Sequence, residues 1–396
     1  MNILFINANL FGHINPTLGL VKELTRRGNR VNYFCSAQFS DSVIQAGATW
    51  IGYGSQLDQF LKDYRPTDRH PFFTLMEYIL QYDEVMLPDI LKYVAENQYD
   101  MIICDSVFGG ALFLKQILKI PVCCSHSSFA MSKAPVPKEM LVKGFHPQLD
   151  HCYHILDRLC ESYHLEKPGL DQVFISRGSM NIVYTTKEFN GEKDMEEPEY
   201  LFAGPSMNRQ EEAADVECFD VQDRTLIYIS LGSINTNNIS FYQLCISTFR
   251  DTDYFVCMSI GNKCETSDLG EIPLNFMVKS FFPQLEILKR AHVFITHAGF
   301  NSVNEALYFG VPMLALPQIN DQHMVAKRLV SMHLGMTESL KELSPEILKT
   351  KTEELLLDRQ IKENCNRISQ NMRSTGALLQ VVKELEQYGK SWKERQ

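Results

Sequence analysis

Short hydrophobic runs alternate with helical patterns along most of the chain. Ile3 to Ala8 is apolar, and the polar stretch from Asn9 to Asn15 that follows it is interpreted as a loop. From about Pro16 to Arg27 apolar residues recur at helical spacing, which predicts a helix that Gly28 ends. The alternation continues with predicted strands and one helix at Val31–Cys35, Ala48–Tyr53, Met101–Cys104, Gly109–Lys119 (the helix) and Val122–Ser125. Strands that alternate with helices predict an α/β fold with a parallel, doubly wound sheet.

The same pattern begins again at Thr225. It predicts strands at Leu226–Leu231, Tyr254–Ser259, Asn275–Lys279, His292–Thr296 and Pro312–Leu316, with helices at Phe241–Phe249 and Asn301–Phe309. The last stretch, Ser344 to Tyr388, is helical in pattern, and Pro135 to Lys167 is interpreted as a loop followed by a helix.

Two doubly wound, Rossmann-like domains are therefore expected, facing each other across a cleft in which such folds place their ligands. Between them, Met207 to Arg224 is polar and acidic, as linkers are. The predicted division is an N-terminal acceptor domain at 1–210, a linker at 211–224, a nucleotide-binding domain at 225–374, and a C-terminal helix and tail at 375–396 that packs back on the first domain.

Composition narrows the class of partner. The 396 residues carry a formal net charge of -10, so neither nucleic acid nor an anionic membrane is a favoured partner, although backbone N–H groups can still bind a nucleotide phosphate. Eleven cysteines without a CxxC pair indicate a reducing compartment. No 18-residue apolar stretch and no signal-peptide pattern are present, so the protein is expected to be cytoplasmic.

The segment from Phe281 to Gln322 has the features of a phosphate site. His297 to Ser302 is a predicted turn from strand to helix, where a helix N-terminus would direct unpaired N–H groups and its positive dipole end at a diphosphate. Asn301 and Glu305 share one face of that helix, and a carboxylate there can accept two hydrogen bonds from a ribose diol. Taken singly, these pieces also fit a structural interpretation: Ser302 and Glu305 match a capping box.

Several motifs occur together in a fixed order: Phe-Gly-His-x-Asn-Pro at 11–16, Ser-Leu-Gly-Ser at 230–233, Pro-Gln at 283–284, His-x-Gly-x-Asn-Ser at 297–302, Glu305, Gly-Val-Pro at 310–312 and Asp-Gln at 321–322. This series resembles the UDP-glycosyltransferase family with the GT-B fold, especially the bacterial macrolide and flavonoid glycosyltransferases. The resemblance covers nearly the whole chain.

The resemblance implies a role for each matching residue. Phe281, with Phe282 beside it, stands where plant members place a tryptophan against uracil, and Gln284 lies beside uracil and ribose. The residues expected at the diphosphate are Ser233, His297, Gly299, Asn301 and Ser302. Glu305 is expected to hold the ribose hydroxyls, and Asp321 with Gln322 the hydroxyls of the sugar. Two departures weaken strict uridine preference: Ala298 replaces a glycine or cysteine, and Phe281 replaces tryptophan.

His13 and Asp105 are the candidate catalytic pair. His13 lies in the predicted loop after the first strand, and Asp105 directly follows the strand Met101–Cys104. Both therefore reach the carboxyl edge of one sheet, where an imidazole can take a proton and a carboxylate can orient it. The alternatives are an incidental histidine and a helix cap before Val107. The resemblance assigns the pair to base and supporting acid.

The reaction that the resemblance implies is a single in-line displacement with inversion, in which a hexose, with glucose favoured, passes from UDP to a hydroxyl of a small hydrophobic acceptor. No cofactor and no metal are expected for this reaction. His151 and His154 have a spacing that suits a metal but lack a third ligand. Ser127 and Ser128 could reach the sugar or form a local turn. Phe72 and Met76 could line an acceptor pocket or a helix core.

The sequence argues against one other class of enzyme and leaves two alternative functions open. A nicotinamide dehydrogenase needs G-x-G-x-x-G after the first strand, and the chain supplies one glycine there. A catalytically inactive relative that binds a nucleotide sugar, and a transferase with a lipid acceptor, are the two alternatives. The expected state is a monomer or a weak homo-oligomer, without stable membrane insertion.

Overall fold

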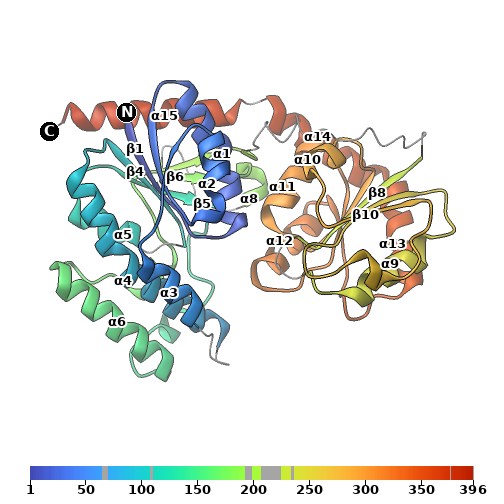
Figure 1. The fold of residues 1–396 in the computed structure, drawn as a ribbon, viewed down its shortest axis with the longest axis horizontal. Coiled ribbons are helices and arrows are strands. Elements are labelled where there is room, and N and C mark those ends of the chain that lie inside the picture. Colours follow the sequence, from blue (N-terminus) through green and yellow to red (C-terminus); the bar gives the residue numbers. More distant parts are fainter. Residues whose placement is uncertain are drawn as a thin grey trace. The chain divides into compact units, whose positions relative to one another are not determined.

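The computed structural model describes residues 1–64, 70–107, 110–191, 199–206, 224–232, 236–374 and 376–395. The chain divides into two compact units (Figure 1). Unit 1 consists of Met1–Ser206 and Ala377–Gln396, and unit 2 of Met207–Gly376. The predicted linker at 211–224 lies outside the described residues except for Arg224.

Unit 1 is built on a seven-stranded sheet in the order β3-β2-β1-β4-β5-β6-β7, in which every pair is parallel. Because the chain leaves β3 and returns to the other side of β1, the sheet has a switch point between β1 and β4, where doubly wound folds bind ligands. The strands are β1 Asn2–Ile6, β2 Arg30–Phe34, β3 Thr49–Ile51, β4 Met101–Asp105, β5 Val122–His126, β6 Asn181–Val183 and β7 Tyr200–Phe202.

Helices cover both faces of this sheet, and two apolar clusters form the cores between them. Alternate residues of β1 enter different clusters: Leu4 and Ile6 pack with α4, whereas Ile3 and Phe5 pack with α1 and α15. The helices are α1 Phe11–Arg26, α2 Ser40–Gln45, α3 Ser55–Asp63, α4 Pro71–Glu96, α5 Gly110–Ile117, α6 Pro147–Tyr163, α7 Leu170–Phe174, α8 Lys187–Asn190 and α15 Ala377–Lys393.

Unit 2 repeats this topology with six parallel strands in the order β10-β9-β8-β11-β12-β13. Its switch point lies between β8 and β11. The strands are β8 Leu226–Ser230, β9 Phe255–Ser259, β10 Phe276–Lys279, β11 Val293–Thr296, β12 Met313–Ala315 and β13 Gly335–Thr337. The helices are α9 Ile239–Phe249, α10 Gln284–Leu288, α11 Phe300–Phe309, α12 Asn320–Ser331, α13 Pro345–Leu357 and α14 Arg359–Ser374.

The C-terminal helix α15 belongs to unit 1. It packs against α1 through Val381, Val382 and Leu385, which are buried in the same cluster as α1 (Figure 1). Glu386 accepts hydrogen bonds from the Arg27 guanidinium and from the Asn29 amide. These contacts hold α15 against α1 and the turn that follows it.

The two doubly wound sheets confirm the predicted fold class, and each strand predicted from the sequence is present within about two residues of its expected ends. The facing arrangement of the domains and the cleft between them stay predictions. One local prediction is wrong. The stretch from Asn9 to Asn15 is not a loop, because α1 already begins at Phe11, with Leu10 as N-cap and Pro16 inside the helix.

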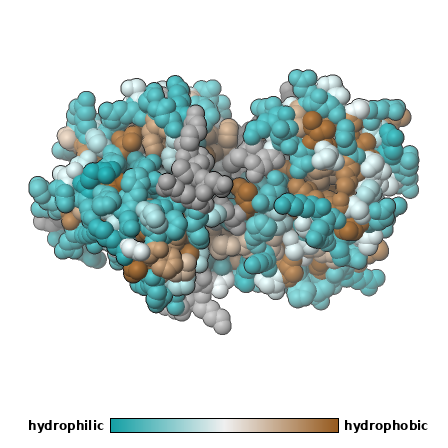
Figure 2. Space-filling model, turned by 90° about the horizontal axis from the view of Figure 1, so that it is seen from below, coloured by the Kyte–Doolittle hydropathy of each residue, from teal (hydrophilic) through white to brown (hydrophobic). Residues whose placement is uncertain are grey.

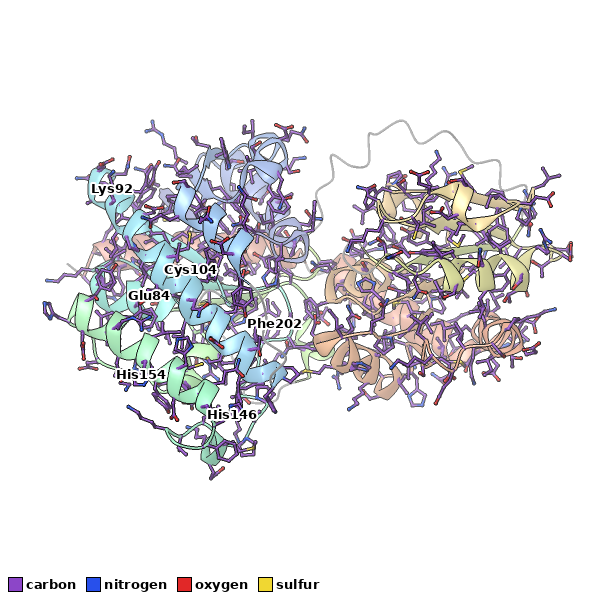
Figure 3. All side chains as sticks on the ribbon, turned by 60° about the horizontal axis from the view of Figure 1, so that its bottom comes forward. Glu84, Lys92, Cys104, His146, His154 and Phe202 are labelled. Atoms are coloured by element: carbon purple, nitrogen blue, oxygen red, sulfur yellow. The ribbon has the colours of Figure 1, made fainter. Side chains whose placement is uncertain are left out.

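Helices α4 and α6 lie side by side in Figure 3, where Glu84 and Lys92 mark the first and His154 the second. A two-bond ion pair between Arg158 and Glu84 joins them on the outer side, and apolar residues of both helices fill the core behind. The segment that the sequence left open as pocket or core is thus part of a 26-residue helix.

The surface in Figure 2 is mainly hydrophilic, with hydrophobic residues in small groups. The ten cysteines that the structure describes are all buried free thiols. Among the described residues, no helix has the length and apolar character needed to cross a membrane.

Candidate active site

His13 and Asp105 meet at the switch point of unit 1. Strands β1 and β4 are neighbours, with Ile6 opposite Cys104, so the residues that follow them come close together. Nδ1 of His13 lies 2.8 Å from Oδ2 of Asp105, and the carboxylate is fully buried while the imidazole is about 18% exposed. In general, a carboxylate that accepts from Nδ1 fixes the tautomer and orientation of an imidazole, so that Nε2 can take a proton.

Asp105 is held in place by the chain that follows it. Its Oδ1 accepts a hydrogen bond from the backbone N–H of Val107 at 2.8 Å, so each carboxylate oxygen has its own partner. This bond closes a local turn rather than capping a helix, since Val107 lies before α5. The turn and the contact with His13 are compatible because they use different oxygens.

Ser127, which follows β5, contacts the same imidazole. Its Oγ lies 2.8 Å from Nδ1 of His13, and the side chain is buried. The sequence suggested a sugar contact or a local turn for Ser127, and nothing in its pattern indicated the histidine. Ser128 is half-buried beside it.

The backbone of His13 is also fixed. The Asn7 amide donates to the His13 carbonyl at 3.1 Å and to the hydroxyl of Tyr33 at 2.7 Å, and Thr17 pairs with the same hydroxyl. Asn7, Tyr33 and Thr17 are buried. His13 therefore stands on the first turn of α1 with both its ring and its main chain oriented by buried groups.

Phe72 and Met76 lie on α4. Met76 is fully buried in the core, and Phe72 is half-buried against Phe174 with ring centroids 4.7 Å apart. This placement matches the helix-core interpretation. A contact with an acceptor stays a prediction for Phe72 and Met76.

In unit 2 the predicted phosphate turn lies at the corresponding switch point, after β8 and β11. Gly232 has a φ of +81°, and a Cβ atom added there would lie 2.6 Å from Cε1 of His297. A Cβ atom at Gly299 would also collide with this ring, at Nε2. Both positions thus need glycine, because the imidazole of His297 packs directly against their backbones. Ser233 lies outside the described residues.

The helix N-terminus behind this turn has the geometry of an anion site. Gly299 is the N-cap of α11 and has no side chain that could cap the helix, and helix N-termini of this kind favour anions. Asn301 and Ser302 occupy the first turn and are half-buried. Ala298 has a left-handed φ of 62°, which costs a non-glycine residue about 1 kcal/mol and explains why a glycine suits this position.

Gln284, Ser302 and Glu305 form one hydrogen-bonded group. The Gln284 amide nitrogen donates to Oε2 of Glu305 at 2.5 Å and to Oγ of Ser302 at 3.2 Å. The structure therefore brings together three residues that the sequence assigned to the ribose and the phosphates, although they come from two helices, α10 and α11.

The remaining donor residues differ in exposure. Phe281 is 52% exposed, as a surface for a nucleobase would be, whereas Phe282 is buried against Tyr228. Asp321 is exposed on the first turn of α12, and Gln322 is buried. The side-chain oxygen of Gln322 accepts from the backbone N–H groups of Gln318 and Ile319 just before α12, and a contact of Gln322 with a sugar stays a prediction.

Two histidines, the buried His126 and the half-buried His297, give the fold a pH dependence. Burial lowers the pKa of His297 to about 4, against a smaller opposing effect of the Ser230 backbone, and burial likewise lowers the pKa of His126 to about 4 from 6.5. Between pH 6.5 and 4 these histidines bind protons in the unfolded chain but not in the folded chain. Their contribution to the free energy of unfolding is therefore complete above pH 6.5 and is lost as the pH falls toward 4.

We expect His126→Gln to lose less stability than the wild type between pH 7.5 and 5, by on the order of 2 kcal/mol, because the glutamine does not titrate. Urea unfolding at the two pH values measures this. Identical losses in both proteins would contradict a neutral buried His126.

The structure describes no cluster of three or more His, Cys, Asp or Glu residues with metal-site geometry, a statement that covers only the described ranges. In those ranges His151 instead pairs with Glu77, at 2.8 Å between Nδ1 and Oε1.

Comparison with known proteins shows the family of the chain. Residues 203–374 match the family described as UDP-glucoronosyl and UDP-glucosyl transferase. The chain is 30% identical over 396 residues to the uncharacterized UDP-glucosyltransferase YdhE of Bacillus subtilis, a match that covers 97% of this chain and 98% of that protein. It belongs to this family.

Two further comparisons support the assignment. Demethyllactenocin mycarosyltransferase of Streptomyces fradiae is 25% identical, over 95% of this chain and 84% of its own length. The crystal structure of the glycotransferase of kitacinnamycin superposes with a TM-score of 0.85 at 25% identity, and 98% of each chain is covered. The chain is thus a UDP-glycosyltransferase of the bacterial macrolide type with the GT-B fold, and the resemblance read from its motifs is confirmed.

Proposed function

We propose that this glycosyltransferase moves a sugar, with glucose favoured, from a UDP-sugar to a hydroxyl group of a small hydrophobic acceptor, with inversion at the anomeric carbon. The observation that carries the proposal is the 2.8 Å contact between His13 and buried Asp105, from elements 92 residues apart. A buried carboxylate behind a partly exposed imidazole is the arrangement of a general base.

In the proposed reaction, Nε2 of His13 accepts the proton of the acceptor hydroxyl while Nδ1–H donates to Asp105. The acceptor oxygen forms a bond to the anomeric carbon as the bond from that carbon to the diphosphate oxygen breaks, and UDP leaves with the electron pair. Negative charge grows on the diphosphate, and the N-terminus of α11 would stabilise it. Ser127 would hold the imidazole in line through its contact with Nδ1.

The donor would be held by unit 2. Phe281 would stack on the base, Glu305 with Gln284 would bind the ribose, and Asp321 with Gln322 would bind the sugar. Ser233, His297, Gly299, Asn301 and Ser302 would contact the diphosphate. Backbone and side-chain donors of this kind need no divalent ion, so we propose metal-independent transfer without a cofactor.

The acceptor is proposed to be a hydrophobic natural product, because the relatives named above include transferases of demethyllactenocin and of kitacinnamycin. Leu10 and Phe11, just before His13, are 45% and 49% exposed, and such apolar side chains beside the base suit an apolar acceptor. A cytoplasmic monomer or weak homo-oligomer is the proposed state.

The test is a donor panel of UDP-glucose, UDP-galactose and UDP-N-acetylglucosamine against a library of phenolic and macrolide acceptors, with and without EDTA, read by mass spectrometry. Proton NMR of the product then gives the anomeric configuration. Glucoside formation with a β linkage that EDTA leaves unchanged supports the proposal. Binding of UDP without turnover of any acceptor would instead favour an inactive nucleotide-sugar-binding relative, and product on lipid acceptors alone would favour the lipid alternative.

A further inference from the structure

We propose that Tyr228 is a positioning residue for recognition of the donor ribose, acting through Gln284 on Glu305. This inference rests on the proposed role of Glu305 in binding the ribose hydroxyls. Tyr228 lies on β8, and its hydroxyl donates to Oε1 of Gln284 at 3.2 Å. Gln284 in turn donates to Oε2 of Glu305 at 2.5 Å. A buried hydroxyl is thus linked to the ribose carboxylate through one amide group.

The chemistry of the three groups makes this chain directional. An ionised carboxylate only accepts hydrogen bonds, so the NH₂ group of Gln284 must face Glu305. The carbonyl oxygen of the same amide then points the other way, where it needs a donor. The hydroxyl of Tyr228 is that donor, and it selects one of the two flip states of the amide.

The ring of Tyr228 has little freedom to move. It is 1% exposed, stacks on Phe294 with centroids 4.8 Å apart and planes 14° apart, and meets Phe282 edge-on. Burial also raises the pKa of its hydroxyl, so the group stays a protonated donor. Because the ring is fixed on a central strand of the sheet, its hydroxyl fixes Gln284, and Gln284 fixes one oxygen of Glu305.

The chain of contacts makes a specific prediction about donor selection. A carboxylate held in one orientation can bind the two hydroxyls of a ribose together, whereas a 2′-deoxyribose offers only one. Loss of the Tyr228 hydroxyl frees the amide to flip and the carboxylate to turn. Affinity for UDP should then fall, while affinity for 2′-deoxy-UDP, which never used the full arrangement, should change little.

The experiment measures the dissociation constants of UDP and 2′-deoxy-UDP by calorimetry for the wild type and Tyr228→Phe. We expect the UDP constant to rise about 3- to 10-fold in the variant and the preference for UDP to fall by the same factor. Tyr242→Phe is the matched control, because Tyr242 is a fully buried tyrosine of the same unit whose hydroxyl donates to the backbone oxygen of Ile260. The preference of the Tyr242→Phe variant for UDP over 2′-deoxy-UDP should equal that of the wild type.

A double variant tests whether Tyr228 acts through Gln284. In a Gln284→Leu background, Tyr228→Phe should cause no further loss of preference, since the link is already broken. If Tyr228→Phe does not fold, Gln284→Leu alone must lower the preference for UDP. Equal weakening of both ligands in Tyr228→Phe, or independent effects in the double variant, would overturn the inference and leave the proposed function standing. A wild type that binds neither ligand would instead refute the proposed function.

Discussion

His13→Ala is expected to lower kcat at least about 10³-fold, because the variant has no group to accept the proton of the acceptor hydroxyl as the new bond forms. General base catalysis contributes about 10² to 10⁴ in comparable enzymes, and the buried Asp105 partner places this imidazole at the upper end. Steady-state transfer from UDP-glucose to the best acceptor of the library measures the loss. UDP affinity, which the proposal assigns to unit 2, should stay within about twofold.

The chain offers a close control. His151 also pairs with a carboxylate, with 2.8 Å between its Nδ1 and Oε1 of Glu77, but its side chain is 45% exposed on α6. His151→Ala removes an equivalent pair from the same unit and should leave kcat unchanged. If His13→Ala keeps more than a tenth of the activity, or if both variants fall together, His13 is not the base.

The fold was largely predictable from the sequence, because fully buried parallel strands form unbroken apolar runs between helical patterns. Met101–Asp105 and Val293–Thr296 are examples in which every residue is buried. The start of α1 could not be found in this way. Leu10 caps it without a side-chain hydrogen bond, and Pro16, which resembles a first helical residue, lies inside the helix. His13 was therefore placed in a loop when it occupies the first turn.

The pairing of His13 with Asp105 was predictable for a general reason. Both follow neighbouring strands of a parallel sheet, and the carboxyl ends of such strands meet at one edge. Ser127 reaches the same imidazole because β5, which it follows, is the neighbour of β4 and ends at the same edge of the sheet. The sequence did not predict this contact, since a serine after a strand fits a turn equally well.

The link between Tyr228 and Gln284 had no signal in the sequence. In the strand Leu226–Ser230 a tyrosine resembles any other core aromatic, and only coordinates show where its hydroxyl points. The same holds for Asn7, whose amide reaches the His13 carbonyl. Whether a polar group inside an apolar element makes a hydrogen bond depends on differences in position of a few tenths of an ångström. The spacing of residues along the chain does not encode such differences.

Asp105→Asn is expected to lower kcat by about 10² to 10⁴ while the KM for acceptor changes little. The geometry explains why so small a change should matter. The backbone N–H of Val107 donates to Oδ1 of residue 105, and an asparagine would keep its oxygen on that side. Its NH₂ group would then face Nδ1 of His13, which must become an acceptor.

The proton of the imidazole would consequently reside on Nε2, the nitrogen that has to take the proton of the acceptor. The variant is expected to fold with a melting temperature within a few degrees of the wild type, since the hydrogen bond of Val107 is retained. Transfer rates under acceptor saturation, together with UDP affinity, separate this effect from a binding defect. Retention of more than a tenth of kcat would mean that the carboxylate only accepts the hydrogen bond of Val107, and that Ser127, whose Oγ also lies within hydrogen-bonding distance of Nδ1, can set the tautomer of His13.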